Sequence, residues 1–129
     1  MSRVLALDYG SARCGVALSD PTRTLATPLP AVERPATKRG LATLVRLVEE
    51  REVAQVVVGL PLTLRGEEGE QAIETRAFAD RLARRVAAPV ELHDERLTTR
   101  QALRSGGAAD LDSRAAAHLL EGWLAGARA

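Results

Sequence analysis

The first twenty residues constrain the fold more than any other stretch of the chain. Two apolar runs, over residues 3–9 and 14–19, are separated by only a few residues. Gly10 and Gly15 supply the backbone freedom that a tight connection needs. The pattern predicts two strands joined by a short turn, with one acid, Asp8, near the end of the first strand.

The remaining segments alternate between strand-like and helical patterns, which is typical of crossover connections between parallel strands. Thr37 is a plausible N-cap for the first helix. The expected elements are an edge strand or extended arm over 23–32, helices over 37–51 and 112–126, a helix from about 67–70 onward, and strands over 53–58 and 90–93, with a further helix start within 94–102 and a flexible loop over 105–111. This order predicts an α/β fold, a mixed sheet with helices on both faces.

The middle helix is expected to bury one apolar stripe and to be broken by Pro89. Trp123, on the apolar side of the last helix, is expected to pack in the core. The predicted stripe of the middle helix consists of Phe78, Leu82 and Val86, with Ile73 and Ala77 beside it.

Length and composition narrow the class of protein. A chain of 129 residues, 46% of them hydrophobic, predicts one domain over 1–129. Its one cysteine, Cys14, excludes an internal disulfide and favours the cytoplasm. No apolar run approaches the ~20 residues of a membrane helix, and no signal-peptide pattern is visible, so no membrane association is expected.

The net charge of +1 does not by itself indicate a protein that binds nucleic acid. Seventeen of the eighteen basic residues are arginines, which bind phosphate bidentately, a bias that a GC-rich genome also explains.

Three acids fall at the ends of predicted elements. Asp8 ends the first strand, Glu95 follows the last strand, and Asp112 opens the final helix. Strand ends and helix starts on one edge of such a sheet converge on a crevice. Each acid also has a simpler interpretation: Asp8 as a turn former, Glu95 as a surface partner of Arg96 or Arg100, and Asp112 as an N-cap.

Converging carboxylates repel one another unless a cation lies among them. Carboxylate oxygens are the ligands that Mg²⁺ and Mn²⁺ prefer, and two such ions roughly 4 Å apart suit phosphodiester cleavage. Asp94 and Asp110 are also near, so composition leaves open which neighbour points inward. His93 shares the face of Glu95 by strand alternation, although a packed or solvent-facing histidine is the simpler interpretation.

Four segments carry a family resemblance: "LALDYGSARCGVALSD", "VVVGLPLTLRGEEGEQ", "DERLTTRQA" and "DSRAAAHLLEGWL". Together, and in this order, they resemble the bacterial pre-16S rRNA nuclease or Holliday-junction-resolvase-like family, within the ribonuclease-H-like superfamily. The resemblance covers nearly the whole chain and implies a mixed sheet with the strand order 3-2-1-4-5. Two residues depart from the family pattern in the loop after the fourth strand: Thr63 replaces a frequent Asn, and Arg65 replaces Asp or Asn.

The resemblance also implies which acids act. Its motifs align with Asp8, Glu95 and Asp112 as catalytic residues and metal ligands, which resolves the choice among neighbouring acids. It implies a nuclease that depends on two Mg²⁺ or Mn²⁺ ions. The implied partner is nucleic acid, at the 5′ end of the 16S rRNA precursor and, by homology, in branched DNA.

Arg13, Arg96, Arg100 and Thr98 lie beside these acids in the sequence and are candidates to bind substrate phosphates. For the arginines, solvation or pairing with local acids is the alternative. For the threonine, helix capping is the alternative.

Two other classes of function stay open at this point. An actin-like ATPase uses a similar strand–Asp–glycine turn for phosphates, but needs a second such domain. A non-catalytic RNA-binding assembly factor suits the near-neutral charge, whereas three acids in family positions argue against it. Junction resolution would require two active sites, and therefore a homodimer.

Overall fold

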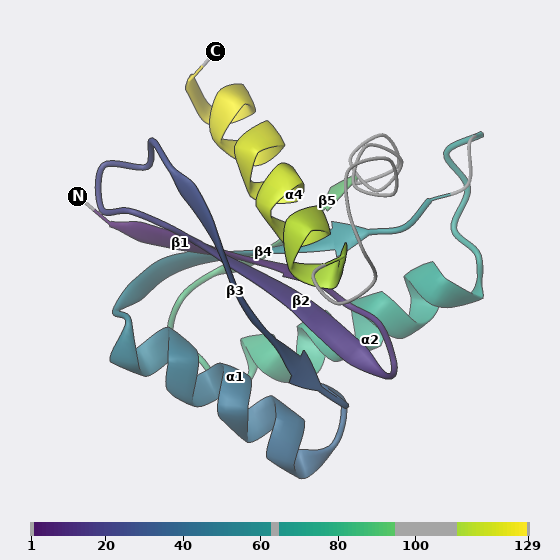
Figure 1. Cartoon of the computed structure of the whole chain (residues 1–129). Coiled ribbons are helices and arrows are strands. Elements are labelled where there is room, and N and C mark those ends of the chain that lie inside the picture. The colour runs from purple at the N-terminus through teal and green to yellow at the C-terminus, as the bar shows by residue number, and fades with distance from the viewer. Residues whose placement is uncertain (1, 63–64, 95–110, 129) are drawn as a thin grey trace.

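The computed structural model describes residues 2–62, 65–94 and 111–128, and it shows one sheet with helices on both sides (Figure 1). The strands lie in the order β3-β2-β1-β4-β5, which confirms the predicted mixed sheet and its order. β1 pairs antiparallel with β2 and parallel with β4. The strands are β1 Arg3–Asp8, β2 Arg13–Ser19, β3 Ala26–Glu33, β4 Val53–Leu60 and β5 Val90–Asp94.

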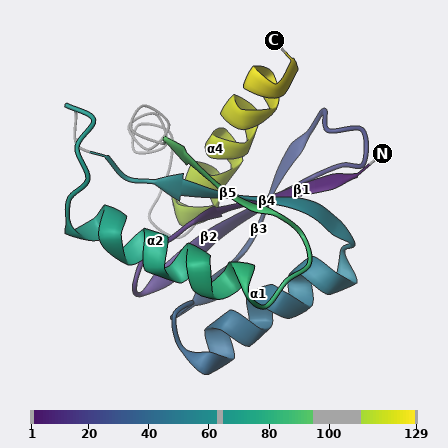
Figure 2. The ribbon, with the colours of Figure 1, turned by 180° about the vertical axis from the view of Figure 1, so that it is seen from behind.

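Strand alternation divides the interior into two cores. In β1, Leu5 and Leu7 point to one face, and Val4 and Ala6 point to the other. Helices α1 and α2 cover the first face and α4 covers the second, as the view from behind also shows (Figure 2). The helices are α1 Lys38–Glu50, α2 Glu70–Ala83 and α4 Leu111–Arg128.

The predicted N-cap of α1 is confirmed. The Thr37 hydroxyl oxygen accepts a hydrogen bond from the Gly40 backbone N–H at 3.1 Å. A Cβ at Gly40 would lie 2.1 Å from the Arg34 carbonyl oxygen, so glycine is required for this close start of the helix. The edge-strand interpretation of the proline-bearing segment is also confirmed, because β3 borders the sheet.

The predicted buried stripe of α2 is wrong in part. Phe78 and Leu82 are buried, but Ile73 is 64% exposed and Ala77 is exposed as well. Ala72, Thr75 and Ala79 take the inward positions instead. At 100° per residue, the stripe through Ala72, Thr75 and Ala79 faces the sheet and leaves the neighbouring stripe in solvent.

The end of α2 also differs from the expectation that Pro89 breaks it. The helix ends at Ala83, because the chain must reverse before Val90 begins β5. The Pro89 carbonyl oxygen already accepts from the Val56 N–H at 2.9 Å, so Pro89 belongs to the sheet connection. Within the parts of the chain that the structure describes, no helix is long and apolar enough to cross a membrane.

Candidate active site

Asp8 lies at the carboxyl end of the central strand, on the face that α4 covers. Val4 and Ala6 of β1 pack in the core beneath α4, and alternation places Asp8 on the same face. Asp8 is half-buried and pairs with Gly15 of the antiparallel neighbour β2. The acid therefore stands in mid-sheet, at the edge where the parallel strands β1, β4 and β5 end.

Gly15 brings Asp112 to this position. A Cβ built on Gly15 would lie 1.8 Å from the Asp112 carbonyl oxygen and 2.9 Å from the Ser113 nitrogen. The first turn of α4 thus rests directly on β2, beside the strand position occupied by Asp8. Two of the three predicted acids, which are far apart in the sequence, therefore lie at one edge of the sheet.

Ser113 anchors this helix start, and the sequence analysis did not identify it. Its buried hydroxyl donates to the Leu29 carbonyl oxygen of β3 at 2.5 Å and accepts from the Val16 N–H of β2 at 3.5 Å. One small side chain therefore joins α4 to two strands. The signal in the sequence was slight, since a serine next to an acid at a helix start also suits simple capping.

Arg13 lies at the start of β2 and pairs with Asp112. Its Nε donates to the Asp112 Oδ2 at 3.1 Å, and the two side chains are 56% and 32% exposed. The turn that positions Arg13 is tight, because a Cβ at Gly10 would lie 2.7 Å from the Arg13 carbonyl oxygen. The positive guanidinium offsets part of the repulsion between acids gathered at this edge.

Asp112 lies inside the first turn of α4. A carboxylate is favoured there by the positive end of the helix dipole. Its main-chain oxygen contacts the strand at Gly15 and its side chain turns to Arg13. The residue thus contributes both packing and charge.

The parallel strands β4 and β5 end at the same edge. Leu60 pairs with Asp94, and Gly59 pairs with His93, which alternation places on the α4 face. Glu95 follows Asp94 in the sequence. Glu95 itself lies outside the described residues, and so do the predicted phosphate ligands Arg96, Thr98 and Arg100.

The donor set at this edge suits a hard divalent cation. Asp8 and Asp112 supply carboxylate oxygens, the ligand type that Mg²⁺ and Mn²⁺ prefer. Among the described residues, no group of three or more His, Cys, Asp or Glu side chains could hold a metal ion. The described residues alone therefore provide two of the three predicted ligands.

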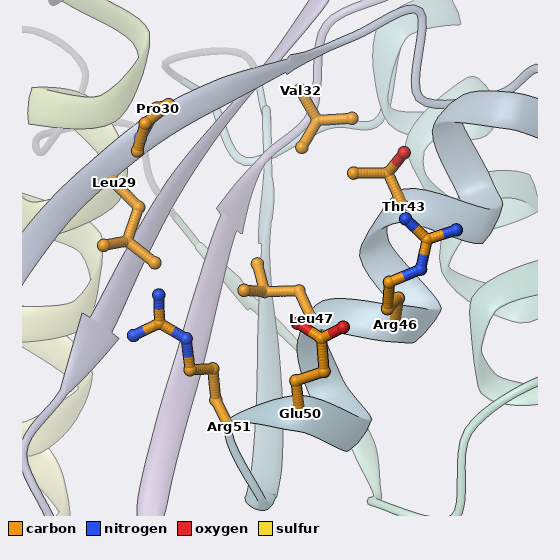
Figure 3. A pocket seen from close by; sticks show the side chains of 8 residues that line it. All are labelled: Leu29, Pro30, Val32, Thr43, Arg46, Leu47, Glu50 and Arg51. Atoms are coloured by element: carbon orange, nitrogen blue, oxygen red, sulfur yellow. The ribbon is translucent and has the colours of Figure 1, made fainter.

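A groove of about 250 Å³ lies on the other side of the sheet, between β3 and α1 (Figure 3). Arg46 and Arg51 project toward it from the α1 segment. It is separated from Asp8 by the sheet and does not belong to the acidic site. Its lining is Leu29, Pro30, Val32, Thr43, Arg46, Leu47, Glu50 and Arg51.

Comparison with known proteins shows which family the chain belongs to. The chain matches the model of the RuvX family, described as Holliday junction resolvase, over residues 2–126. It is 46% identical over 136 residues to a protein of Anaeromyxobacter named pre-16S rRNA nuclease, covering 98% of this chain and 99% of the relative. A relative of the same name from Chloroflexus aurantiacus is 45% identical over 130 residues, covering 94% of this chain and 85% of the relative.

One solved structure supports the fold. It is T. thermophilus RuvC in complex with a Holliday junction substrate, with a TM-score of 0.55 and 15% identity, covering 98% of this chain and 96% of that one. The strand order of the sheet and the family match over residues 2–126 agree. The chain belongs to the RuvX family of nucleases.

Proposed function

We propose that the protein hydrolyses phosphodiester bonds of structured nucleic acid at the edge where Asp8 and Asp112 converge, and that its substrate is the 5′ end of the 16S rRNA precursor. The observation that carries the proposal is the contact of α4 with Gly15, which sets Asp112 beside the strand pair that holds Asp8. The name shared by the relatives supports the choice of rRNA.

Asp8, Glu95 and Asp112 would hold Mg²⁺ or Mn²⁺, in a pair of ions. When bound, such ions neutralise clustered carboxylates, activate water and stabilise the charge on a leaving oxygen. Asp8 is held in place by β1, which is paired on both sides. A ligand on a rigid central strand keeps the geometry that in-line displacement needs.

Arg13 would bind a substrate phosphate next to these acids. Its bond to Asp112 uses Nε, and a guanidinium also carries donors on both terminal nitrogens. The side chain is 56% exposed, so a phosphate can reach it. Arg96, Arg100 and Thr98 are proposed to add phosphate contacts, because they follow Glu95 closely in the sequence.

A second candidate function is the resolution of branched DNA. The description of the matching family favours it. Symmetric cleavage of a four-way junction requires two active sites, so this function implies a homodimer. A protein that only trims a single RNA end needs no second site.

The whole chain, residues 1–129, is proposed to act as one nuclease domain in the cytoplasm, where ribosomes are assembled. Its single, buried cysteine, Cys14, agrees with a reducing compartment.

The decisive experiment compares the wild type with Asp8→Asn on pre-rRNA 5′ leaders, single strands and four-way junctions, with Mg²⁺ or Mn²⁺. Asp8→Asn preserves size and should fold normally, which circular dichroism and thermal melting check. Cleavage should fall by at least about a hundredfold, in keeping with the loss of several kcal/mol of charge stabilisation. Calorimetric titration with Mn²⁺ gives a second readout and should show weaker binding by the variant.

Cleavage by Asp8→Asn at the wild-type rate would overturn the role of Asp8. Salt-sensitive RNA binding that is equal in both proteins, with no cleavage by either, would support a non-catalytic assembly factor instead. The preferred substrate in the panel decides between rRNA trimming and junction resolution.

A further inference from the structure

A cavity of about 330 Å³ lies on the α4 face of the sheet, between β5 and the second half of α4. Its volume falls within the range of small-molecule sites, about 300–1,000 Å³. The described residues that line it are Glu91, His93, Trp123 and Gly126. The proposed hydrolysis of phosphodiesters assigns no role to any of them.

Trp123 forms a fixed aromatic wall of this cavity. It packs partly against the core beneath α4 rather than being fully buried, which refines the expectation of simple core packing. Its indole Nε1 donates to the Glu91 Oε2 at 2.7 Å, and the Arg23 guanidinium carbon lies 5.9 Å from the ring centroid. Hydrogen bond and cation–π contact together hold the ring in one orientation.

Gly126 keeps the cavity open. It lies one helical turn after Trp123 on α4, and a Cβ built on it would meet nothing within 4 Å. The same is true of Gly122, which is not among the lining residues. The open space beside Trp123 therefore depends on the absence of a side chain at residue 126.

The cavity lies on the same face of the sheet as the acidic edge. Leu7 of β1 pairs with Val58 of β4, so the next residues, Asp8 and Gly59, lie side by side. Gly59 in turn pairs with His93 of β5. Two strand spacings of about 4.8 Å place His93, the lining residue on β5 nearest the edge, about 10 Å from Asp8.

Trp123 follows Asp112 by eleven residues on α4, which is about 16 Å along the helix axis at about 1.5 Å per residue. A stacked nucleic-acid strand rises about 3.4 Å per nucleotide, so Trp123 lies about five nucleotides from the acids.

From these contacts we infer that the cavity is a nucleobase site, in which an unpaired base several nucleotides from the cleaved bond stacks on Trp123. The inference rests on the proposed function and adds a contact that recognises single-stranded substrate. Proteins bind unpaired bases by stacking them on aromatic side chains, and this contributes about 1–3 kcal/mol per base.

The chemistry of the lining favours a base over a phosphate. Glu91 is acidic, and none of the described lining residues is Arg or Lys. A carboxylate that already accepts from Trp123 retains further acceptor positions, which suit the exocyclic amino group of adenine, cytosine or guanine. Uracil has no such amino group and should bind less tightly.

The chain carries one tryptophan, so its fluorescence reports on this site alone. The experiment titrates full-length Asp8→Asn protein, in the presence of EDTA, with oligoadenylate, oligouridylate and an abasic oligonucleotide, each of about ten nucleotides and equal phosphate count. Tryptophan quenching and the anisotropy of an end-labelled oligonucleotide are read together. We expect quenching by oligoadenylate, weaker quenching by oligouridylate and none by the abasic chain.

Gly126→Leu tests the cavity without removing the fluorophore. Leucine is a good helix former and meets no neighbour at its Cβ, so the variant should fold. It should abolish quenching and weaken oligoadenylate binding about five- to a hundredfold, the equivalent of one lost stack. Gly122→Leu is the matched control on the same helix and should behave like the parent.

The outcomes separate this inference from the proposed function. Anisotropy that reports binding while Trp123 fluorescence stays constant would overturn the base site, and so would equal quenching by the abasic chain. If oligoadenylate quenches Trp123 fluorescence but the wild-type protein cleaves no substrate, the base site is supported and the nuclease proposal is overturned. If the protein neither binds the oligonucleotides nor cleaves any substrate, both the base site and the nuclease proposal are overturned.

Discussion

Gly15 is the residue on which the geometry of the acidic edge most depends. Its backbone lies in an ordinary strand conformation, so conformational freedom is not the reason for glycine here. The reason is space, since any Cβ would overlap the main chain of Asp112. A main-chain atom cannot rotate away as a side chain can, so a larger residue must displace the helix itself.

Gly15→Ala should therefore lower both stability and cleavage. Overpacking of this kind costs about 1–3 kcal/mol, and displacement of Asp112 should reduce the cleavage rate. Urea denaturation and the cleavage assay measure the two effects. Gly122→Ala, on an open part of α4, is the control and should be neutral or stabilising by up to about 1 kcal/mol. Unchanged stability and activity in Gly15→Ala would contradict the packing argument.

At the scale of elements, the position of α4 on the sheet determines whether a site exists. Its apolar side packs on Val4, Ala6 and Val57. Such packing fixes the face that the helix covers, but apolar contacts alone tolerate sliding. The hydrogen bonds of Ser113 to β2 and β3 fix where along the strands the helix begins.

Ser113→Ala should loosen this anchor. The Leu29 carbonyl oxygen would lose a buried partner, which costs about 1–3 kcal/mol. Denaturant unfolding gives the stability change, and hydrogen exchange should show faster exchange in the first turn of α4. Thr43→Ala is the matched control, because it also removes a hydroxyl that donates to a carbonyl oxygen, here in an exposed hydrogen bond within α1. It should change stability by less than about 0.5 kcal/mol, and an equal loss in both variants would argue against the anchor.

At the scale of the whole molecule, acids at the two ends of the sheet have different surroundings. Asp8 and Asp112 lie at one edge of the sheet, and Asp20 lies in the β2–β3 turn. In that turn the Asp20 carboxylate accepts from the Leu25 and Thr24 N–H groups and from the hydroxyls of Thr22 and Thr24. Asp20 is thus a structural acid.

These contacts predict a loss of stability in acid. Hydrogen bonds from the Leu25 N–H first, and then from the Thr22 hydroxyl, hold the pKa of Asp20 well below its usual range. The pKa of Glu68 is lowered by its hydrogen bonds from Arg76. Because both folded pKa values are depressed, the stabilisation is complete above the unfolded values near about 4. It is lost as the pH falls through the folded values.

This expectation is checked by comparing the melting temperatures of the wild type and of Asp20→Asn between about pH 6 and about pH 2. The amide keeps one acceptor oxygen for the backbone N–H groups and loses the one that faces the threonines. The variant should melt below the wild type near neutrality, and the difference should narrow in acid. A difference that is independent of pH would contradict the assignment.

Much of the fold could be predicted from local patterns. The β1–β2 connection and the N-cap at Thr37 depend on residues close together in the sequence, and both are confirmed. The stripe on α2 could not be assigned correctly, because two adjacent stripes carry apolar residues. Thr75 can be buried at little cost because its hydroxyl donates to the Gln71 carbonyl oxygen at 2.7 Å, whereas Ile73 faces solvent.

The sequence by itself determined the class of fold and the family, because these follow from short motifs and from their order, and the same motifs predict Asp8, Glu95 and Asp112 as the acting acids. Only the tertiary structure decided the partner of Arg13, the need for glycine at residue 15 and the cavity beside Trp123. Arg13 and Asp112 are 99 residues apart, and no local pattern encodes such a contact. It arises because the two cores fix α4 against β2, and that placement is a property of the whole packed chain.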